Sequence, residues 1–172
     1  MSVELRFIAP DLRRLDQVAT EVLAVPLASD ERPPRGAAGL VDWRLAGMLS
    51  RVLCSDFVTG TLGEVVLMPG RPKLGFDKIL LFGVGAQSGF DEGVFEVVVG
   101  KMLSTLEGLK ARTAVVDLPG RRFGGITAER AVDLLLAAVR IRPYHDLWTL
   151  IEPSESHKLL ADQVLRERRR QK

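Results

Sequence analysis

Two glycine-bearing turns are the places where this sequence could hold a ligand through its backbone. The first, Gly83–Gly89, follows an apolar run and precedes a helical pattern, a position where amides and a helix dipole can bind phosphate. Its spacing, G-x-G-x-x-x-G, is one residue longer than the dinucleotide fingerprint, and the expected acidic residue is met only loosely, by Asp117. A tight strand-to-helix turn needs glycine with or without a ligand, so a purely structural role is the first interpretation.

The second turn carries two arginines among three glycines. Arg121 and Arg122 stand between Gly120 and the pair Gly124 and Gly125, just before a helical pattern. Guanidinium groups beside amides at a helix N-terminus suit an anionic ligand. The alternative is that both arginines are solvated loop charges.

These two turns should rim a single crevice. If both leave the carboxyl ends of neighbouring strands, they meet where open α/β sheets bind ligands. A phosphate-containing small molecule is the ligand class that such a crevice would take. The predicted anion crevice consists of Gly83, Gly85, Gly120, Arg121, Arg122, Gly124 and Gly125.

The titratable side chains offer little catalytic chemistry. His145 and His157 have no His, Cys or carboxylate at metal-ligand spacing, so we expect no metal, and nothing indicates another cofactor. Ser88 lacks the G-x-S-x-G frame of a nucleophile elbow. We expect Cys54, the single cysteine, to be a buried and inert thiol. The sequence therefore predicts no catalytic residue.

The elements that must position these residues alternate between short apolar runs and longer amphipathic stretches. The predicted strands are Ser2–Ala9, Glu21–Leu27, Gly63–Pro69, Asp77–Val84, Thr113–Leu118 and Asp146–Ile151. The predicted helices are Leu40–Leu53, Asp91–Leu109, one capped by Thr127, and a last one capped by Ser154 or Ser156. This order predicts an α/β domain of three layers, α/β/α, with a mixed, mostly parallel sheet.

Three details of these elements are also predicted. Pro26 should push its strand towards an edge of the sheet or an early end. Ile79–Phe82 is a continuous apolar run, as expected of a central strand that is covered on both faces. Residues 29–39 should form a loop, because prolines and glycines interrupt any period there.

Length and composition agree with one globular domain. The chain has 172 residues, 47% hydrophobic and 27% charged, so we treat 1–172 as one domain with a basic C-terminal tail at 156–172. A single cysteine favours the reducing cytoplasm, and no apolar run reaches the ~18 residues of a membrane helix. The tail arginines (Arg166, Arg168, Arg169 and Arg170) could contact nucleic acid or an acidic partner, but a solvated helix end is the simpler interpretation, because no aromatic residues are interleaved with them.

Several of these runs resemble the N-terminal domain of the leucyl (cytosol) aminopeptidase family. Glu21–Leu27 has the form of its VLAVPL strand, and Gly60–Glu64 leads into the apolar run Val65–Leu67. Asp77–Gly85 is similar to the family's RVLLVGLG strand and is followed by a long helix that ends at 106–110. The resemblance covers roughly residues 15–140.

This resemblance implies a macro-domain-like fold without peptidase chemistry. In the family, the two-metal site lies in a separate C-terminal domain, whose Asn-Thr-Asp-Ala-Glu-Gly-Arg signature has no counterpart in this sequence. The family's N-terminal domain packs on the outside of a hexamer. The resemblance therefore implies a non-catalytic role in assembly or regulation, with a protein partner or a homo-oligomer.

The macro-domain kinship implies an alternative function. Arg35–Asp42 resembles the glycine-rich loop before the first core helix of ADP-ribose-binding macro domains, and Gly120–Ile126 takes the place of their phosphate loop. Pro26–Ser29 stands where those proteins have Asn-Ala-Ala-Asn, and Arg121 and Arg122 stand near their Ser-Thr-Gly. On this interpretation the domain would bind or hydrolyse ADP-ribose or a related phosphate compound.

Overall fold

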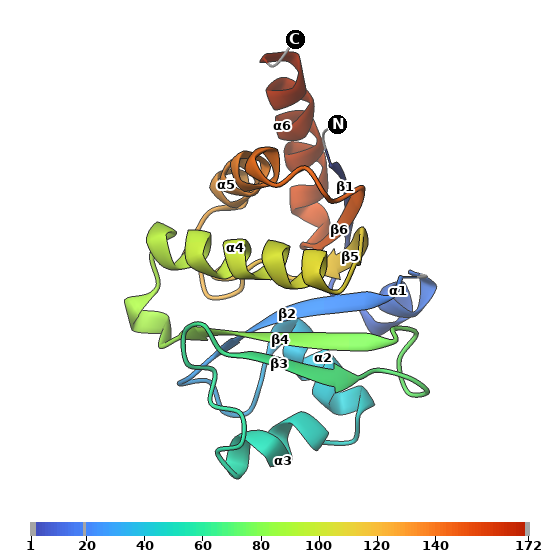
Figure 1. Cartoon of the computed structure of the whole chain (residues 1–172), viewed down its shortest axis with the longest axis vertical. Helices are drawn as coiled ribbons and strands as arrows, with labels where there is room; N and C mark the ends of the chain where they lie inside the picture. Colours follow the sequence, from blue (N-terminus) through green and yellow to red (C-terminus); the bar gives the residue numbers. More distant parts are fainter. Residues whose placement is uncertain (1–2, 19, 171–172) are drawn as a thin grey trace.

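The computed structural model describes residues 3–18 and 20–170, whose strands form one mixed sheet (Figure 1). The strands are β1 (Glu4–Ile8), β2 (Val22–Ala28), β3 (Val65–Pro69), β4 (Lys78–Gly85), β5 (Thr113–Val116) and β6 (Leu147–Ile151). Their order across the sheet is β1-β6-β5-β2-β4-β3. Only β3 runs antiparallel to its neighbour, β4, so the sheet is mostly parallel as predicted.

Helices cover both faces of the sheet and complete the three predicted layers (Figure 1). One face packs against α4 (Glu92–Gly108), α5 (Ala128–Ile141) and α6 (His157–Arg170). The other face packs against α1 (Leu12–Gln17), α2 (Gly36–Arg44) and α3 (Met48–Cys54). Short 3-10 turns, η1 (Gln87–Gly89) and η2 (Ser154–Ser156), precede α4 and α6. Within the described ranges, no helix combines the length and the apolar character needed to cross a bilayer.

The apolar run of β4 is buried on both sides, as its composition predicts. Leu80 and Phe82 point into the core beneath α4, whereas Ile79 and Leu81 point into the core beneath α2 and α3. Successive side chains of a strand point to opposite faces, so a strand between two helical layers must be apolar throughout.

The expectation for Pro26 was wrong, because β2 is an interior strand. Pro26 pairs in register with Phe82 of β4, while β5 pairs with β2 only at Leu23 and Ala24. The proline therefore lies beyond the last β5 pair, where a missing N–H removes no ladder hydrogen bond on that side.

The predicted helix Leu40–Leu53 is in fact two helices, and the first begins inside the predicted loop. α2 starts at Gly36, and the chain turns between α2 and α3 at Ala46 and Gly47, which have φ angles of 56° and 77°. An apolar stripe with helical spacing continues across this turn, so the periodicity alone conceals the break.

The caps of the two long helices follow the predicted chemistry. Asp91 accepts a hydrogen bond from the Val94 amide at the start of α4, at 2.8 Å. Thr127 accepts one from the Arg130 amide at the start of α5, at 3.3 Å. Each side chain satisfies an amide that has no partner within its helix.

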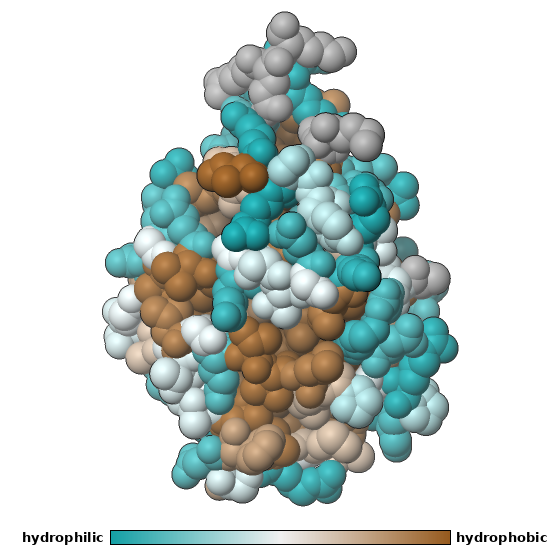
Figure 2. All heavy atoms as spheres, in the orientation of Figure 1, coloured by the Kyte–Doolittle hydropathy of each residue, from teal (hydrophilic) through white to brown (hydrophobic). Residues whose placement is uncertain are grey.

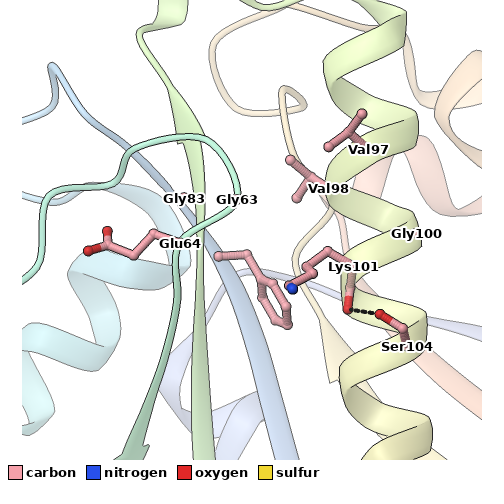
Figure 3. A pocket seen from close by; sticks show the side chains of 9 residues that line it. Gly63, Glu64, Gly83, Val97, Val98, Gly100, Lys101 and Ser104 are labelled. Atoms are coloured by element: carbon pink, nitrogen blue, oxygen red, sulfur yellow. Dashed lines mark hydrogen bonds between the residues drawn. The ribbon is translucent and has the colours of Figure 1, made fainter.

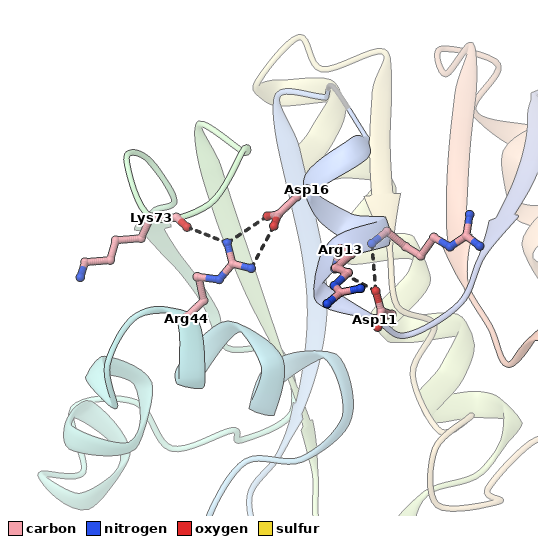
Figure 4. A network of polar contacts seen from close by, with 6 residues as sticks. Asp11, Arg13, Asp16, Arg44 and Lys73 are labelled. Atoms are coloured by element: carbon pink, nitrogen blue, oxygen red, sulfur yellow. Dashed lines mark hydrogen bonds and ion pairs between the residues drawn. The ribbon is translucent and has the colours of Figure 1, made fainter.

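A polar network fixes the first helices against the neighbouring loop (Figure 4). Arg44 at the end of α2 donates to both carboxylate oxygens of Asp16 in α1, at 3.1 and 2.9 Å, and to the carbonyl of Lys73. Asp11 caps α1 by accepting from the amides of Arg13 and Arg14. The network is partly exposed and orients these segments more than it stabilises them.

Candidate functional site

A small crevice lies at the carboxyl ends of the parallel strands, where the sequence predicts the site. It holds only about 20 Å³ of free space. Its lining consists of Pro26, Ala28, Glu31, Arg35, Val84, Asp117, Leu118, Gly120, Arg122 and Phe123. β2 lies between β4 and β5, so the two glycine turns do not leave neighbouring strands, contrary to our expectation.

Arg122 closes the crevice by pairing with an acid from another loop. Its guanidinium donates to the carboxylate of Glu31, which is buried and follows β2. The stem of Arg122 lies against Gly36, where an added Cβ would be 2.5 Å from the arginine Cδ. The side chain therefore lies over the N-terminus of α2 and is held by an ion pair, although it remains partly exposed to solvent.

Arg121 points to a different partner, at the end of β6. Its Nε and Nη2 donate to the two carboxylate oxygens of Glu152, at 2.7 and 2.9 Å. Its Nη1 donates to the carbonyl of Ile126 at 2.7 Å. Glu152 is only 1% exposed, so this bidentate pair anchors the turn to the sheet and leaves Arg121 outside the crevice lining.

The glycines of the second turn make room for Phe90. A Cβ at Gly120 would overlap the Phe90 ring, and one at Gly125 would be 2.6 Å from its Cδ1. Phe90 also meets Phe123 edge to face, with ring centroids 5.3 Å apart. Gly124 has φ +74° and no neighbour near its Cα, so it serves the turn itself.

The glycines of the first turn support a neighbouring loop. A Cβ at Gly83 would overlap the carbonyl of Thr61, and the Gly85 amide donates to the carbonyl of Gly60 at 2.9 Å. Gly83 lines a separate cleft beside α4, and neither glycine lines the crevice. The structure thus brings together Gly120 and Arg122 of the predicted set, and separates them from Gly83 and Gly85.

Asp117 is the titratable group that the crevice perturbs most. Burial, together with the negative charge of Glu152, raises its pKa to about 7, although Arg122 and Arg121 offset part of the effect. Two other acids, Glu152 and Glu31, and two arginines act on it, and Arg35 also lines the crevice. Positive and negative groups therefore stand together here, and an anion that binds Arg122 must compete with Glu31 for its guanidinium.

The remaining titratable groups do not form a second centre. Within residues 3–18 and 20–170, no three His, Cys, Asp or Glu residues lie together as a metal site would require. His145 is buried against Trp148, and its pKa is lowered by burial. Cys54 is exposed, which corrects the expectation of a buried thiol, because it lies at the end of α3 on the side away from the core.

The basic tail is part of α6 and is partly engaged. Arg168 donates to the carbonyl of Val3 at 3.1 Å, and Arg140 of α5 pairs with Glu167. The tail thus joins α6 to the start of the chain and to α5. Arg170 ends the helix, but its side chain lies outside the described part.

Three residues that organise the crevice were not among the predicted site residues. Glu31, Phe90 and Glu152 lie in a loop, in the turn after η1 and after β6, respectively. Two adjacent arginines near the sheet need acidic partners, and this need could have indicated Glu31 and Glu152, which follow the strands β2 and β6. Nothing in the local sequence indicates that Phe90 packs against Gly120 and Gly125, because α4 and β5 separate them along the chain.

Comparison with known proteins agrees with this architecture. Residues 22–145 match the model of the cytosol aminopeptidase family, N-terminal domain. A probable cytosol aminopeptidase of Pseudomonas fluorescens (strain Pf0-1) is 30% identical over 118 residues, which are 69% of this chain and 23% of that protein. One of Pseudomonas syringae pv. tomato is 29% identical over 103 residues, 60% of this chain and 21% of that protein. The chain thus spans under a quarter of the length of these relatives.

Solved structures show the same fold at low sequence identity. The macrodomain of Mycobacterium tuberculosis DarG has a TM-score of 0.68 at 16% identity, covering 87% of this chain and 99% of its own. A Trypanosoma brucei macrodomain in complex with ADP has a TM-score of 0.72 at 14% identity, covering 93% of this chain and 67% of that one. Tomato leucine aminopeptidase has a TM-score of 0.62 at 14% identity, covering 87% of this chain and 32% of its own.

The fold is therefore macro-domain-like, in three α/β/α layers, as the resemblance implied. The family model covers more than half of the chain and begins at β2, the strand with the VLAVPL sequence. The chain belongs to the cytosol aminopeptidase family, through the N-terminal domain of that family.

Proposed function

We propose that this domain acts in assembly, as a non-catalytic unit that associates through the free edge of its sheet. The observation that carries the proposal is the exposed apolar edge strand β3. Leu67 in this strand is 55% exposed, and Figure 2 shows a hydrophobic area over β3 and the adjoining strands. Because its relatives are named cytosol aminopeptidases, we place this activity in the cytoplasm.

The main chain of β3 is suited to pairing with another strand. The Gly83 amide donates to the carbonyl of Glu64, so these two residues face each other as a hydrogen-bonded pair. In an antiparallel ladder the pairing alternates, which turns the N–H and C=O groups of Val65 and Leu67 outward. A second copy could pair there about a two-fold axis, using the same strand on both sides.

The crevice supports the same proposal, because it leaves little space for a ligand. Arg122 and Glu31 occupy the position at which macro-like folds open to a ligand, and only about 20 Å³ remains free. A nucleotide needs a pocket of roughly 300 Å³ or more. Association, and not ligand chemistry, is then the function that the described surfaces favour.

Sedimentation velocity over a range of protein concentrations tests this proposal. The wild type should sediment faster as concentration rises, and Leu67→Lys should remain monomeric because a charge would enter the shared edge. Leu159→Lys is the matched control, since Leu159 is similarly exposed but lies on α6. A wild type that stays monomeric, or equal behaviour of the two variants, would contradict association through β3.

A second candidate function is binding of a phosphate-containing molecule in the crevice. Arg122 and Gly120 favour it, because a guanidinium and a glycine turn stand together at the carboxyl ends of β2 and β5. The site would open if an anion replaced Glu31 at Arg122. Glu31→Gln should therefore bind inorganic phosphate more tightly than the wild type, with the amide resonances of Gly120 and Gly124 moving in the titration. Equal shifts in both proteins would dismiss the candidate.

A further inference from the structure

A second cleft, separate from the crevice, lies between α4 and the β3–β4 side of the sheet (Figure 3). Its free volume is about 200 Å³, ten times that of the crevice. Three positions in its lining are glycines: Gly63, Gly83 and Gly100. At Gly63 and Gly100 an added Cβ would meet no atom within 4 Å, so both face open space.

Three apolar side chains form part of the lining of this cleft. Phe82 contributes from β4, and Val97 and Val98 contribute from α4. Figure 3 shows both valines projecting from the helix towards the strands. Val97 is largely exposed, so apolar surface continues from the cleft to its mouth. Water gains little from such walls, and a compact apolar group would displace it favourably.

The charge in the cleft is positive. Lys101 projects from α4 into the space between helix and strands, and no ion pair or hydrogen bond of its ammonium is found within the described ranges (Figure 3). Glu64 also lines the cleft, but its carboxylate points to the other side. There it accepts from the amides of Thr59 and Gly60, at 3.0 and 2.6 Å. These bonds hold it away from Lys101.

We propose that this cleft binds a small monocarboxylate that carries a branched aliphatic or aromatic group. The carboxylate pairs with the ammonium of Lys101, and the apolar group lies between Phe82 and the valines. The volume sets the size, because drug-sized ligands need roughly 300–1,000 Å³ and this cleft offers less. The hydroxyl of Ser104, which also lines the cleft, donates to the carbonyl of Lys101, so the Lys101 ammonium is the donor that we assign to the carboxylate.

The test is a titration of the whole chain, labelled with ¹⁵N, by 4-methylpentanoate. Amide resonances of Gly63, Gly83, Gly100 and Lys101 should shift together and saturate at millimolar ligand. The neutral amide of the same acid tests the charge, and acetate tests the apolar group. Both should bind at least about threefold more weakly, because each lacks one of the two interactions.

Variants of the lysine assign the charge. Lys101→Gln should weaken the binding of 4-methylpentanoate about threefold or more, because it removes the charge. Lys101→Arg keeps the charge and should retain the affinity; both substitutions are at an exposed helical position, where either residue is tolerated. Lys158→Gln, at an exposed lysine of α6, is the matched control and should bind as the wild type does. The proposal is overturned if no saturable shift centres on these glycines, if the acid and its amide bind equally, or if Lys101→Gln binds as the wild type.

Discussion

Asp117 gives the crevice a measurable pH dependence. Its pKa is raised to about 7, chiefly by burial, whereas an unfolded aspartate titrates near 4. Between these values the folded chain holds a proton that the unfolded chain has released, so stability falls as pH rises from about 4 to 7. Asp117→Asn should remove this loss and stabilise the protein at pH 8 by about 1–2 kcal/mol, less than the full shift would give, because the residue as a whole is only partly buried.

Urea denaturation of the wild type and Asp117→Asn at pH 5 and pH 8 measures this effect. The difference between the two proteins should be smaller at pH 5, where the folded aspartate still holds its proton, than at pH 8, where it has lost it. The matched control is Asp162→Asn, which changes an acid of α6 away from the crevice. Asp91→Asn would not serve, because Asp91 caps α4. A difference that is the same at both pH values would contradict the raised pKa.

His145 should make the stability depend on pH in the opposite sense to Asp117, with the loss at acidic pH. Burial lowers its pKa, and backbone groups of Ala111 and Leu103 offset only part of that change. In the unfolded chain this histidine binds a proton near pH 6.5, whereas in the folded chain it stays neutral at that pH. Stability therefore falls as pH drops below this value. His145→Phe keeps an aromatic ring against Trp148 and should lose less stability between pH 7 and pH 5 than the wild type. Thermal melting at both pH values checks this, and equal losses would contradict it.

At the residue scale, the sequence predicted the positions of the glycine turns but not their contacts. Gly120 and Arg122 do line the crevice at the carboxyl ends of the strands. The partner of Arg122 is Glu31, whose position depends on how the loop after β2 folds back over the sheet. Contacts between such distant segments follow from packing, which local residue patterns do not contain.

Among the elements, β4 should contribute most to stability. Leu81 is buried in the core beneath α2 and α3, and truncating it leaves a cavity that the neighbouring helices cannot fill. Leu81→Ala should therefore reduce the free energy of unfolding by about 2–5 kcal/mol. Leu67→Ala, on the exposed side of the adjacent strand, should cost less than about 1 kcal/mol. Chemical denaturation measures both, and a loss under about 1 kcal/mol for Leu81→Ala would show that β4 is peripheral to the core.

Element types could be predicted from periodicity, and the failures have local causes. All six strands and the two long helices match their apolar patterns. The stripe from Leu40 to Leu53 continues through Ala46 and Gly47, so it could not show that the helix breaks there. Pro26 indicated an edge, but the decisive fact is that β5 stops pairing two residues earlier.

For the whole molecule, the three-layer class followed from the alternation of strands and helices, but the strand order did not. The order β1-β6-β5-β2-β4-β3 places β2 between β4 and β5, and this single fact separates the two turns that we expected to meet. Right-handed crossovers restrict the possible orders without selecting one of them. The family resemblance supplied the macro-domain-like class, and the family match at residues 22–145 overlaps most of the predicted range.

Calorimetric titration of the wild-type chain with ADP-ribose is the most direct test of the proposed function. The Arg122–Glu31 pair covers the crevice and only about 20 Å³ is free, so we expect the domain to associate and not to bind nucleotides. The titration should give no saturable heat, and the amide resonances of Gly120 and Arg122 should not move. Saturable binding of one ADP-ribose per chain, with both resonances moving, would contradict this expectation.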